Sequence, residues 1–179
     1  APADGRELRS MLAAAFSYQQ PVAIRYPKGG AAELPILPAP LELGHAVQLQ
    51  DGRDMAFFAI GSMVEPALEA AQILAGYGIQ ARVVNARDIA PLDKEALTRA
   101  VRECQSRLIT VEENVISGGF GAACAEALAG MPIQHIPAAL PPCFQPHGNR
   151  EKQLSELGLD GPGLATLAGK RWFSDKWEG

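Results

Sequence analysis

The sequence predicts an α/β fold, a three-layer sandwich in which a mostly parallel sheet carries helices on both faces. From about residue 43 to residue 136, short apolar runs of strand length alternate with helical patterns. Such alternation is typical of parallel strands joined by right-handed crossovers. Met55–Ile60 is almost continuously apolar, as expected for a strand that is covered on both faces.

The first segment is expected to be a helix followed by a strand. Asp4 can cap the helix with Glu7 three positions on, as in a capping box, and apolar residues from Leu8 to Phe16 then recur at helical spacing. Pro21 ends the helix, and Val22–Arg25 has the pattern of a short strand.

These elements predict a domain boundary. Residues 31–40 are rich in proline and alanine, which indicates a linker. One helix and one strand cannot form a core, so residues 1–30 are expected to be the tail of another domain and residues 41–179 a domain of their own. Since the chain starts at Ala1 without a methionine, we expect it to be processed or cut from a longer protein.

The second domain is expected to contain five strands. Apolar or alternating runs predict them over Leu43–Leu49, Met55–Ile60, Ile79–Asn85, Leu108–Val111 and Ile133–Ile136.

Three helices are expected between the strands. The first covers Val64–Tyr77 and stops at Gly78, where glycine adopts the left-handed conformation. The second begins after Asp93 as its N-cap, and the third covers Gly119–Leu128.

Composition narrows the function classes. The 179 residues are 47% apolar and 20% charged, which indicates a folded soluble domain. A net charge of −4 argues against nucleic acid or an anionic membrane as the main partner, and no apolar run approaches the roughly 18 residues of a membrane span. The three cysteines are odd in number and lack CxxC spacing, so a reducing cytoplasm is expected.

Candidate functional residues follow the strands, because open parallel sheets place their sites at the carboxyl ends of the strands. Gly118 and Gly119 open a helix, where free N–H groups can cradle an anion, or they permit a tight turn and close helix–sheet packing. Glu112 and Glu113 are a candidate acid–base pair, although adjacent strand residues point to opposite faces. Arg87 either binds an anion or pairs with a carboxylate such as Asp93 or Glu112.

Other candidates are basic or histidine side chains. Arg25 and Lys28 place positive charge at the end of the first strand, which suits a phosphate or carboxylate ligand, and solvated linker charges are the alternative. The histidines lack metal-ligand spacing, so no metal site is expected. His147 is either catalytic or fixes its loop by a hydrogen bond.

Five segments, taken in order, resemble motifs of the 1-deoxy-D-xylulose-5-phosphate synthase family, which belongs to the transketolase superfamily. Pro21–Gly29 resembles P-x-A-I-R-Y-P-R-G, and Asn85–Asp93 resembles N-A-R-F-V-K-P-L-D. Thr110–Gly121 matches T-V-E-E-N followed by G-G-F-G, Leu140–Gly148 resembles L-P-D-x-F-x-x-H-G, and Gly158–Asp160 matches G-L-D. The ordered set covers nearly the whole chain.

The resemblance implies the C-terminal part of such an enzyme. Residues 1–30 would be the last helix and strand of the pyrimidine-binding domain, and residues 41–179 the transketolase-type C-terminal domain. The family is a transferase that condenses pyruvate with D-glyceraldehyde 3-phosphate, with release of CO2, using thiamine diphosphate and Mg²⁺. Its product feeds isoprenoid, thiamine and pyridoxal synthesis, and the enzyme is expected to be a cytoplasmic homodimer.

The resemblance also assigns roles. Lys28 occupies the position of the second basic residue of the R-Y-P-R-G motif, which helps to hold the substrate phosphate, and Arg25 is a second candidate. No catalytic, cofactor-binding or metal-binding residue of the family falls within the chain, so the chain alone is expected to be inactive, acting as scaffold and dimer support and binding no cofactor.

Departures from the motifs keep other functions open. Lys28, Asp88, Ala90, Ala139 and Pro142 differ from the family residues, which leaves room for a relative with another acceptor aldehyde. The C-terminal portion of a transketolase or of a 2-oxoacid dehydrogenase β-subunit is one alternative. A non-catalytic α/β interaction module is another.

Overall fold

The computed structural model describes residues 1–30, 33–34 and 41–177. Of the linker expected over residues 31–40, only Glu33 and Leu34 fall within the described residues.

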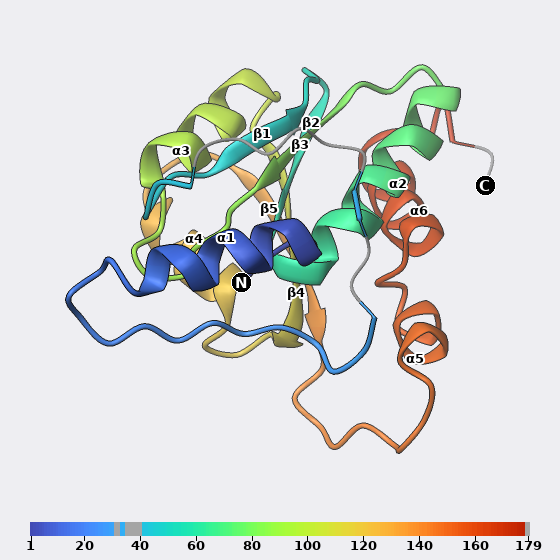
Figure 1. Cartoon of the computed structure of the whole chain (residues 1–179). Coiled ribbons are helices and arrows are strands. Elements are labelled where there is room, and N and C mark those ends of the chain that lie inside the picture. The colour runs from blue at the N-terminus through green and yellow to red at the C-terminus, as the bar shows by residue number, and fades with distance from the viewer. Residues whose placement is uncertain (31–32, 35–40, 178–179) are drawn as a thin grey trace.

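A five-stranded sheet forms the middle of the described structure (Figure 1). Its order is β1-β3-β2-β4-β5, in which β2 to β5 are parallel and β1 runs antiparallel to β3. The expected mostly parallel sheet is therefore confirmed, with one antiparallel strand at its edge. The strands are β1 (Val47–Gln50), β2 (Met55–Ala59), β3 (Ala81–Asn85), β4 (Arg107–Val115) and β5 (Gln134–Leu140).

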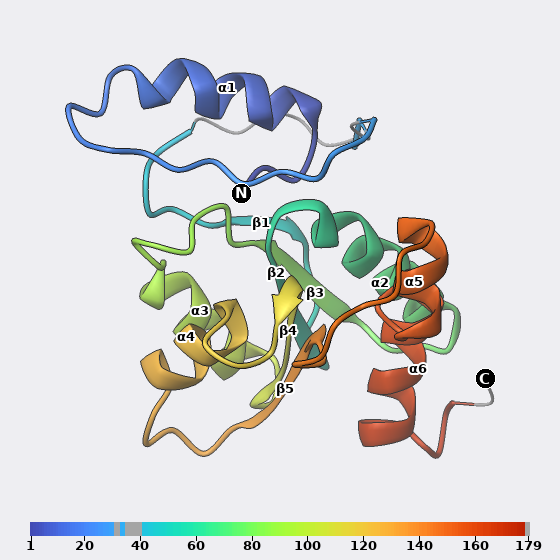
Figure 2. The same ribbon diagram turned by 90° about the horizontal axis from the view of Figure 1, so that it is seen from below.

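Helices cover both faces of the sheet, which confirms the three-layer sandwich (Figure 2). Helices α2 (Val64–Gly76) and α6 (Gly161–Trp172) pack on one face, and α3 (Lys94–Glu103) and α4 (Phe120–Ala127) on the other. A short helix, α5 (Arg150–Glu156), precedes α6. Among the described residues no helix is both long and apolar enough to cross a membrane.

The central strands are apolar along their whole length because both of their faces are buried. Every residue of β2 and β3 is buried. Along β2, Phe57 belongs to the core beneath α2 and α6, whereas Phe58 belongs to the core beneath α3 and α4 and stacks on Phe120.

Local signals in the sequence place several helix ends correctly. The Asp93 carboxylate accepts a hydrogen bond from the Ala96 N–H, and Gly78 has a φ of +71° directly after α2. Helices α5 and α6 were not expected from the sequence, although each has an N-cap side chain, Asn149 and Asp160 respectively. Their short apolar pattern is interrupted by glycines and a proline, which hides its period.

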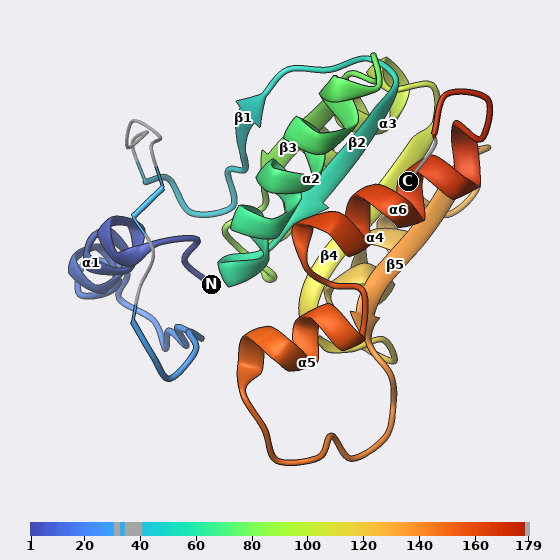
Figure 3. The same cartoon turned by 90° about the vertical axis from the view of Figure 1, so that its right-hand side faces the viewer.

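Helix α1 (Gly5–Ala15) lies outside the three layers (Figure 3). Its predicted capping box is present in part, because Asp4 accepts from the Glu7 N–H, whereas Glu7 accepts from the N–H of Ala3 and not from that of the Asp4 N-cap. The apolar stripe is mostly uncovered, however. Met11 is buried, but Leu12 is exposed and Phe16 is 92% exposed.

The prediction of a strand over Val22–Arg25 is wrong. This segment has no regular secondary structure. A strand is stabilised by hydrogen bonds to a neighbouring strand, and the described sheet does not extend to this segment.

The strand order creates a switch point. The chain leaves β2 toward β3 on one side, and the later strands β4 and β5 lie on the other side. Loops after β2 and β4 therefore diverge, and open α/β sheets bind their ligands in such a crevice.

Candidate functional site

A cavity of about 310 Å³ lies at the switch point between the ends of β2 and β4. Its walls on the sheet side are Ile60, Gly61 and Ser62 after β2, and Glu113 near the end of β4. The opposite wall comes from the N-terminal part of the chain, as Ala1, Arg25, Tyr26 and Pro27. The structure thus brings the first basic residue of the Arg25–Lys28 segment to the carboxyl edge of the sheet.

Arg25 and Lys28 differ in their surroundings. Arg25 lies at the cavity, and its Nη2 donates a hydrogen bond of 2.8 Å to the backbone carbonyl of Glu113. Lys28 is exposed, and within residues 1–30, 33–34 and 41–177 its ammonium has no ion pair.

Glu113 is the centre of a charged cluster. Arg150 of α5 contacts its carboxylate with Nε at 2.8 Å and with Nη2 at 2.5 Å. Ser62 donates to the same carboxylate at 3.0 Å and accepts from Arg150 Nη2 at 3.0 Å. Burial alone would raise the pKa of the Glu113 carboxyl, but hydrogen bonds and charge from Arg150, aided by Ser62, outweigh it and lower that pKa.

The sequence places Ser62 in a loop after a strand, where a site is expected, but nothing in it connects Ser62 with Arg150. They are separated by 88 residues, and Arg150 begins a helix that was not predicted. Asn149 as an N-cap is the signal that could have placed Arg150 at a helix start.

Glu112 points to the other side of β4 and caps α4. Its two carboxylate oxygens accept hydrogen bonds from the Phe120 and Gly121 N–H groups, both at 2.7 Å. A Cβ on Gly119 would lie 2.4 Å from Glu112 Oε2. The glycines therefore allow a close approach between β4 and α4, and the protein's own carboxylate occupies the N–H groups that an anion would need. Glu112 and Glu113 have separate environments and do not form an acid–base pair.

Arg87 is buried and pairs with the carboxylate of Glu7 of α1. The expected pairing with a carboxylate is confirmed, but Asp93 and Glu112, the two examples given, are not the residues seen in this ion pair. Arg87 Nε lies 2.7 Å from Glu7 Oε1. Asp93 and Glu112 accept hydrogen bonds from backbone N–H groups at helix starts instead, and for Asp93 this is the N-cap that the sequence predicts.

Asp88 and His147, two further residues that the sequence singles out, lie in loops. Asp88, where the family motif has phenylalanine, accepts a hydrogen bond from the Gly44 N–H at 2.9 Å and so anchors the chain before β1. His147 is exposed in the loop between β5 and α5.

Most helix starts are capped by side chains of the chain itself. An N–H in the first turn of α1, α3, α4, α5 and α6 donates to a carboxylate or an amide of the chain, whereas α2 has no side-chain cap among the described residues. Among these residues, no three His, Cys, Asp or Glu side chains lie close enough to hold a metal ion.

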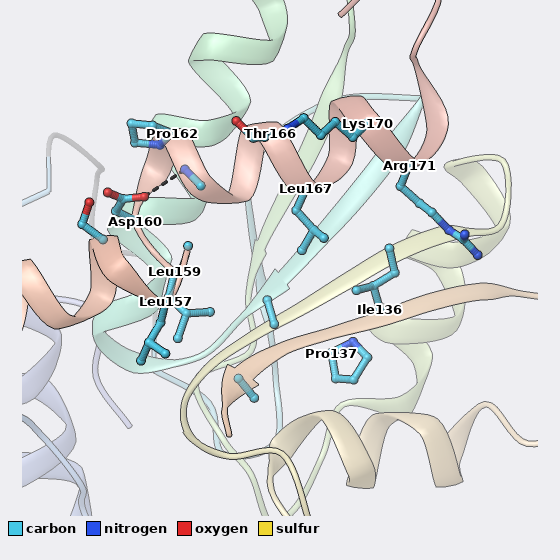
Figure 4. Close-up of a pocket in the computed structure, with 15 residues that line it drawn as sticks. Ile136, Pro137, Leu157, Leu159, Asp160, Pro162, Thr166, Leu167, Lys170 and Arg171 are labelled. Carbon is cyan, nitrogen blue, oxygen red and sulfur yellow. Dashed lines mark hydrogen bonds between the residues drawn. The ribbon is translucent and has the colours of Figure 1, made fainter. Parts of the chain in front are cut away.

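A larger groove of about 870 Å³ lies on the far edge of the sheet, between β5 and α6 (Figure 4). Its floor is apolar, with Ile136, Leu157 and Leu167, and Lys170 and Arg171 lie toward one end. The Gly158–Asp160 motif and Ala139 line this groove, whereas the basic, acidic and histidine candidates from the sequence do not.

The fold and the motifs define a domain class, and comparison with known families agrees. The transketolase C-terminal domain family matches residues 44–164. The chain belongs to this family.

Within that class, the similar proteins are 1-deoxy-D-xylulose-5-phosphate synthases. The chain is 42% identical over 171 residues to the enzyme of that name from Thermomicrobium roseum, covering 93% of this chain and 27% of the relative. It is 44% identical over 176 residues to that of Thioalkalivibrio sulfidiphilus, covering 96% and 26%. The chain therefore spans about a quarter of the length of the curated relatives it matches.

Solved structures agree with this fold. A split-gene transketolase, described as an inactive β4 tetramer, superimposes with a TM-score of 0.87 at 30% identity, covering 98% of this chain and 57% of that one. A transketolase variant from Pichia stipitis superimposes with a TM-score of 0.53 at 21% identity, covering 71% and 18%, and supports the fold alone.

Proposed function

We propose that this chain is the C-terminal portion of a 1-deoxy-D-xylulose-5-phosphate synthase, a transferase that joins pyruvate to D-glyceraldehyde 3-phosphate with loss of CO2. The observation that carries the proposal is the identity of 42% with an enzyme of that name over 93% of this chain. The product is a precursor of isoprenoids, thiamine and pyridoxal. The upstream part of the same polypeptide is the expected partner of this domain, in a cytoplasmic homodimer.

In this proposal the chain supplies a scaffold and one substrate contact. Arg25, Tyr26 and Pro27 line the cavity at the carboxyl edge of the sheet, where α/β folds bind ligands, and Lys28 follows them in the chain. Lys28 would hold the aldehyde's phosphate as a point charge, and Arg25 would add to the positive field there. Exposure of Lys28 is compatible with this role, because its ammonium is accessible to a ligand.

The cofactor belongs to the rest of the protein. Thiamine diphosphate and Mg²⁺ are the group that the family implies, and among the described residues no three His, Cys, Asp or Glu side chains lie close enough to hold the metal. We therefore expect the isolated chain to bind neither and to be inactive. The uncovered apolar side chains of α1, Leu12 and Phe16, support a larger protein that covers them.

The test is a variant in the complete natural protein that contains this chain. Lys28→Ala should raise the KM for glyceraldehyde 3-phosphate and leave the KM for pyruvate unchanged, since pyruvate carries no phosphate. Lys170→Ala, an exposed lysine on the opposite edge of the sheet, is the matched control. An unchanged KM for the phosphorylated aldehyde would contradict the assignment of Lys28.

The similarity to a split-gene transketolase favours one alternative, a subunit that transfers ketol units between sugar phosphates. Substrate profiling separates the two functions. A transketolase consumes a ketose phosphate donor, whereas the proposed synthase consumes pyruvate.

A further inference from the structure

We propose that Glu113 is a positioning residue that holds the Arg25–Lys28 segment over the crevice at the switch point. The inference deepens the proposed function and rests on it, because the segment is the proposed phosphate-binding element.

The backbone near the end of β4 departs from regular pairing. The register between β4 and β5 becomes irregular between Val111 and Val115, around Glu113. Such a bulge removes peptide groups from the ladder and redirects them, often beside a functional site. The Glu113 carbonyl accepts the hydrogen bond from Arg25 Nη2, across 88 positions of sequence.

The side chain of Glu113 is held by two partners, Arg150 and Ser62. Arg150 makes two-pronged contact with the carboxylate, and Ser62 bridges the two partners. Charge-assisted, bidentate pairs of this kind restrict geometry as well as contributing energy. Three elements, the β2–α2 turn, the end of β4 and the start of α5, therefore converge on one residue whose carbonyl faces the segment.

The charged cluster and the Arg25–Lys28 segment both contribute residues to the lining of the same cavity. Of the residues that line the cavity, Ser62 and Glu113 belong to the cluster, and Arg25, Tyr26 and Pro27 belong to the segment. A change in the cluster thus moves the cavity wall on one side and the anchor of Arg25 on the other. A cluster that only stabilised the start of α5 would not be expected to contact the Arg25–Lys28 segment.

The experiment compares Glu113→Gln and Arg150→Gln with a matched control in the complete protein. The control is Glu103→Gln, because Glu103 pairs with Arg82 at 2.5 Å, a carboxylate–guanidinium contact like that of Glu113, at the amino end of the sheet. Ser62→Ala serves as a milder variant should either of the others fail to fold. Two properties are measured: amide hydrogen exchange over residues 22–30, and the KM and kcat for each substrate.

In Glu113→Gln and Arg150→Gln we expect faster amide exchange over residues 22–30. The KM for the phosphorylated aldehyde should rise about tenfold, with the pyruvate KM and kcat little changed. Glu103→Gln should alter neither property. Arg150→Lys, which keeps the charge and one contact, should recover part of the loss.

Two results would overturn the inference. Unchanged exchange over residues 22–30 in folded cluster variants would show that Glu113 does not hold the segment. Faster exchange with an unchanged KM would show that it does not position the segment for substrate. Failure of the proposed function would give a different result from failure of this inference. The unaltered complete protein would then form no product from pyruvate and glyceraldehyde 3-phosphate. The exchange comparison would still decide whether Glu113 holds the segment.

Discussion

The Glu7 carboxylate on α1 lies 2.7 Å from Nε of Arg87, 80 positions later in the chain. Their side chains are 11% and 6% exposed, and Asn85 donates to both oxygens of the same carboxylate at 3.1 and 3.0 Å. Helix α1 lies outside the sandwich, and this nearly buried pair fastens it to the carboxyl end of β3.

Glu7→Gln should release α1 from the domain. Glutamine keeps the size of the side chain but removes the charge, and its amide NH₂ cannot accept from Asn85 or from Arg87. We expect a loss of about 2 kcal/mol of local stability, typical of a hydrogen bond to a charged group, seen as faster amide exchange along α1.

The matched control for this variant is Glu95→Gln, an exposed glutamate in the first turn of α3. It should change the stability of the protein by about 0.5 kcal/mol or less. Equal protection of α1 in the wild type and in Glu7→Gln would mean that the pair does not fasten the helix.

Gly119→Ala should destabilise the contact between β4 and α4. An added Cβ would lie 2.4 Å from Glu112 Oε2 and 2.6 Å from the Val115 carbonyl, so the cap on α4 must move. Overpacking of this kind costs about 1–3 kcal/mol, measurable by urea denaturation.

Gly76→Ala is the control for this substitution. Gly76 ends α2, is exposed and has no atom within 4 Å of the added Cβ, so alanine should stabilise the protein by up to about 1 kcal/mol. If both variants had the same stability, the close approach at Gly119 would not exist.

Sequence reasoning succeeded where a local pattern determines the structure. The continuous apolar run of β2 predicts a strand with two buried faces, and Asp93 predicts the start of α3. The alternation of side chains along a strand separates Glu112 from Glu113, and the structure places them on opposite sides of β4.

It failed where tertiary contacts decide. Arg87 selects Glu7 rather than a carboxylate close to it in sequence, because the docking of α1 brings that residue to the end of β3. The Val22–Arg25 segment has strand propensity but no neighbouring strand among the described residues. The cluster of Ser62, Glu113 and Arg150 joins the β2–α2 turn, the end of β4 and the start of α5, which no spacing rule connects.

One of the three cysteines should react with a thiol reagent in the native protein. Burial raises the pKa of the Cys104 thiol to about 11 and, with the nearby charge of Glu112, that of Cys124 to about 12. Both side chains are fully buried, whereas Cys143 is exposed. Labelling of the native protein with a thiol reagent, followed by peptide mapping, should modify Cys143 and leave Cys104 and Cys124 unmodified until denaturant is added. Rapid modification of Cys104 or Cys124 in the native protein would contradict the described burial.

Stability should fall as the pH is lowered below about 6.5, in part because of His135. Burial lowers the pKa of this imidazole in the folded protein, and its Nε2 lies 2.8 Å from Thr110 Oγ1. As the pH falls, the unfolded chain therefore binds the proton before the folded protein does. The contribution of His135 to stability is complete above the unfolded pKa and is lost as the pH falls from the unfolded pKa to the lower folded pKa.

His135→Gln removes this titration. The free energy of unfolding of the variant should depend less steeply on pH between about 7 and 5 than that of the wild type. Parallel pH profiles would mean that His135 has the same proton affinity in both states.

The most direct test of the account is to assay the complete natural protein that contains these residues with pyruvate, glyceraldehyde 3-phosphate, thiamine diphosphate and Mg²⁺, and to identify the product by mass spectrometry. The account predicts CO2 and 1-deoxy-D-xylulose 5-phosphate in equal amounts. A protein that leaves pyruvate untouched and instead exchanges ketol units between sugar phosphates would contradict it.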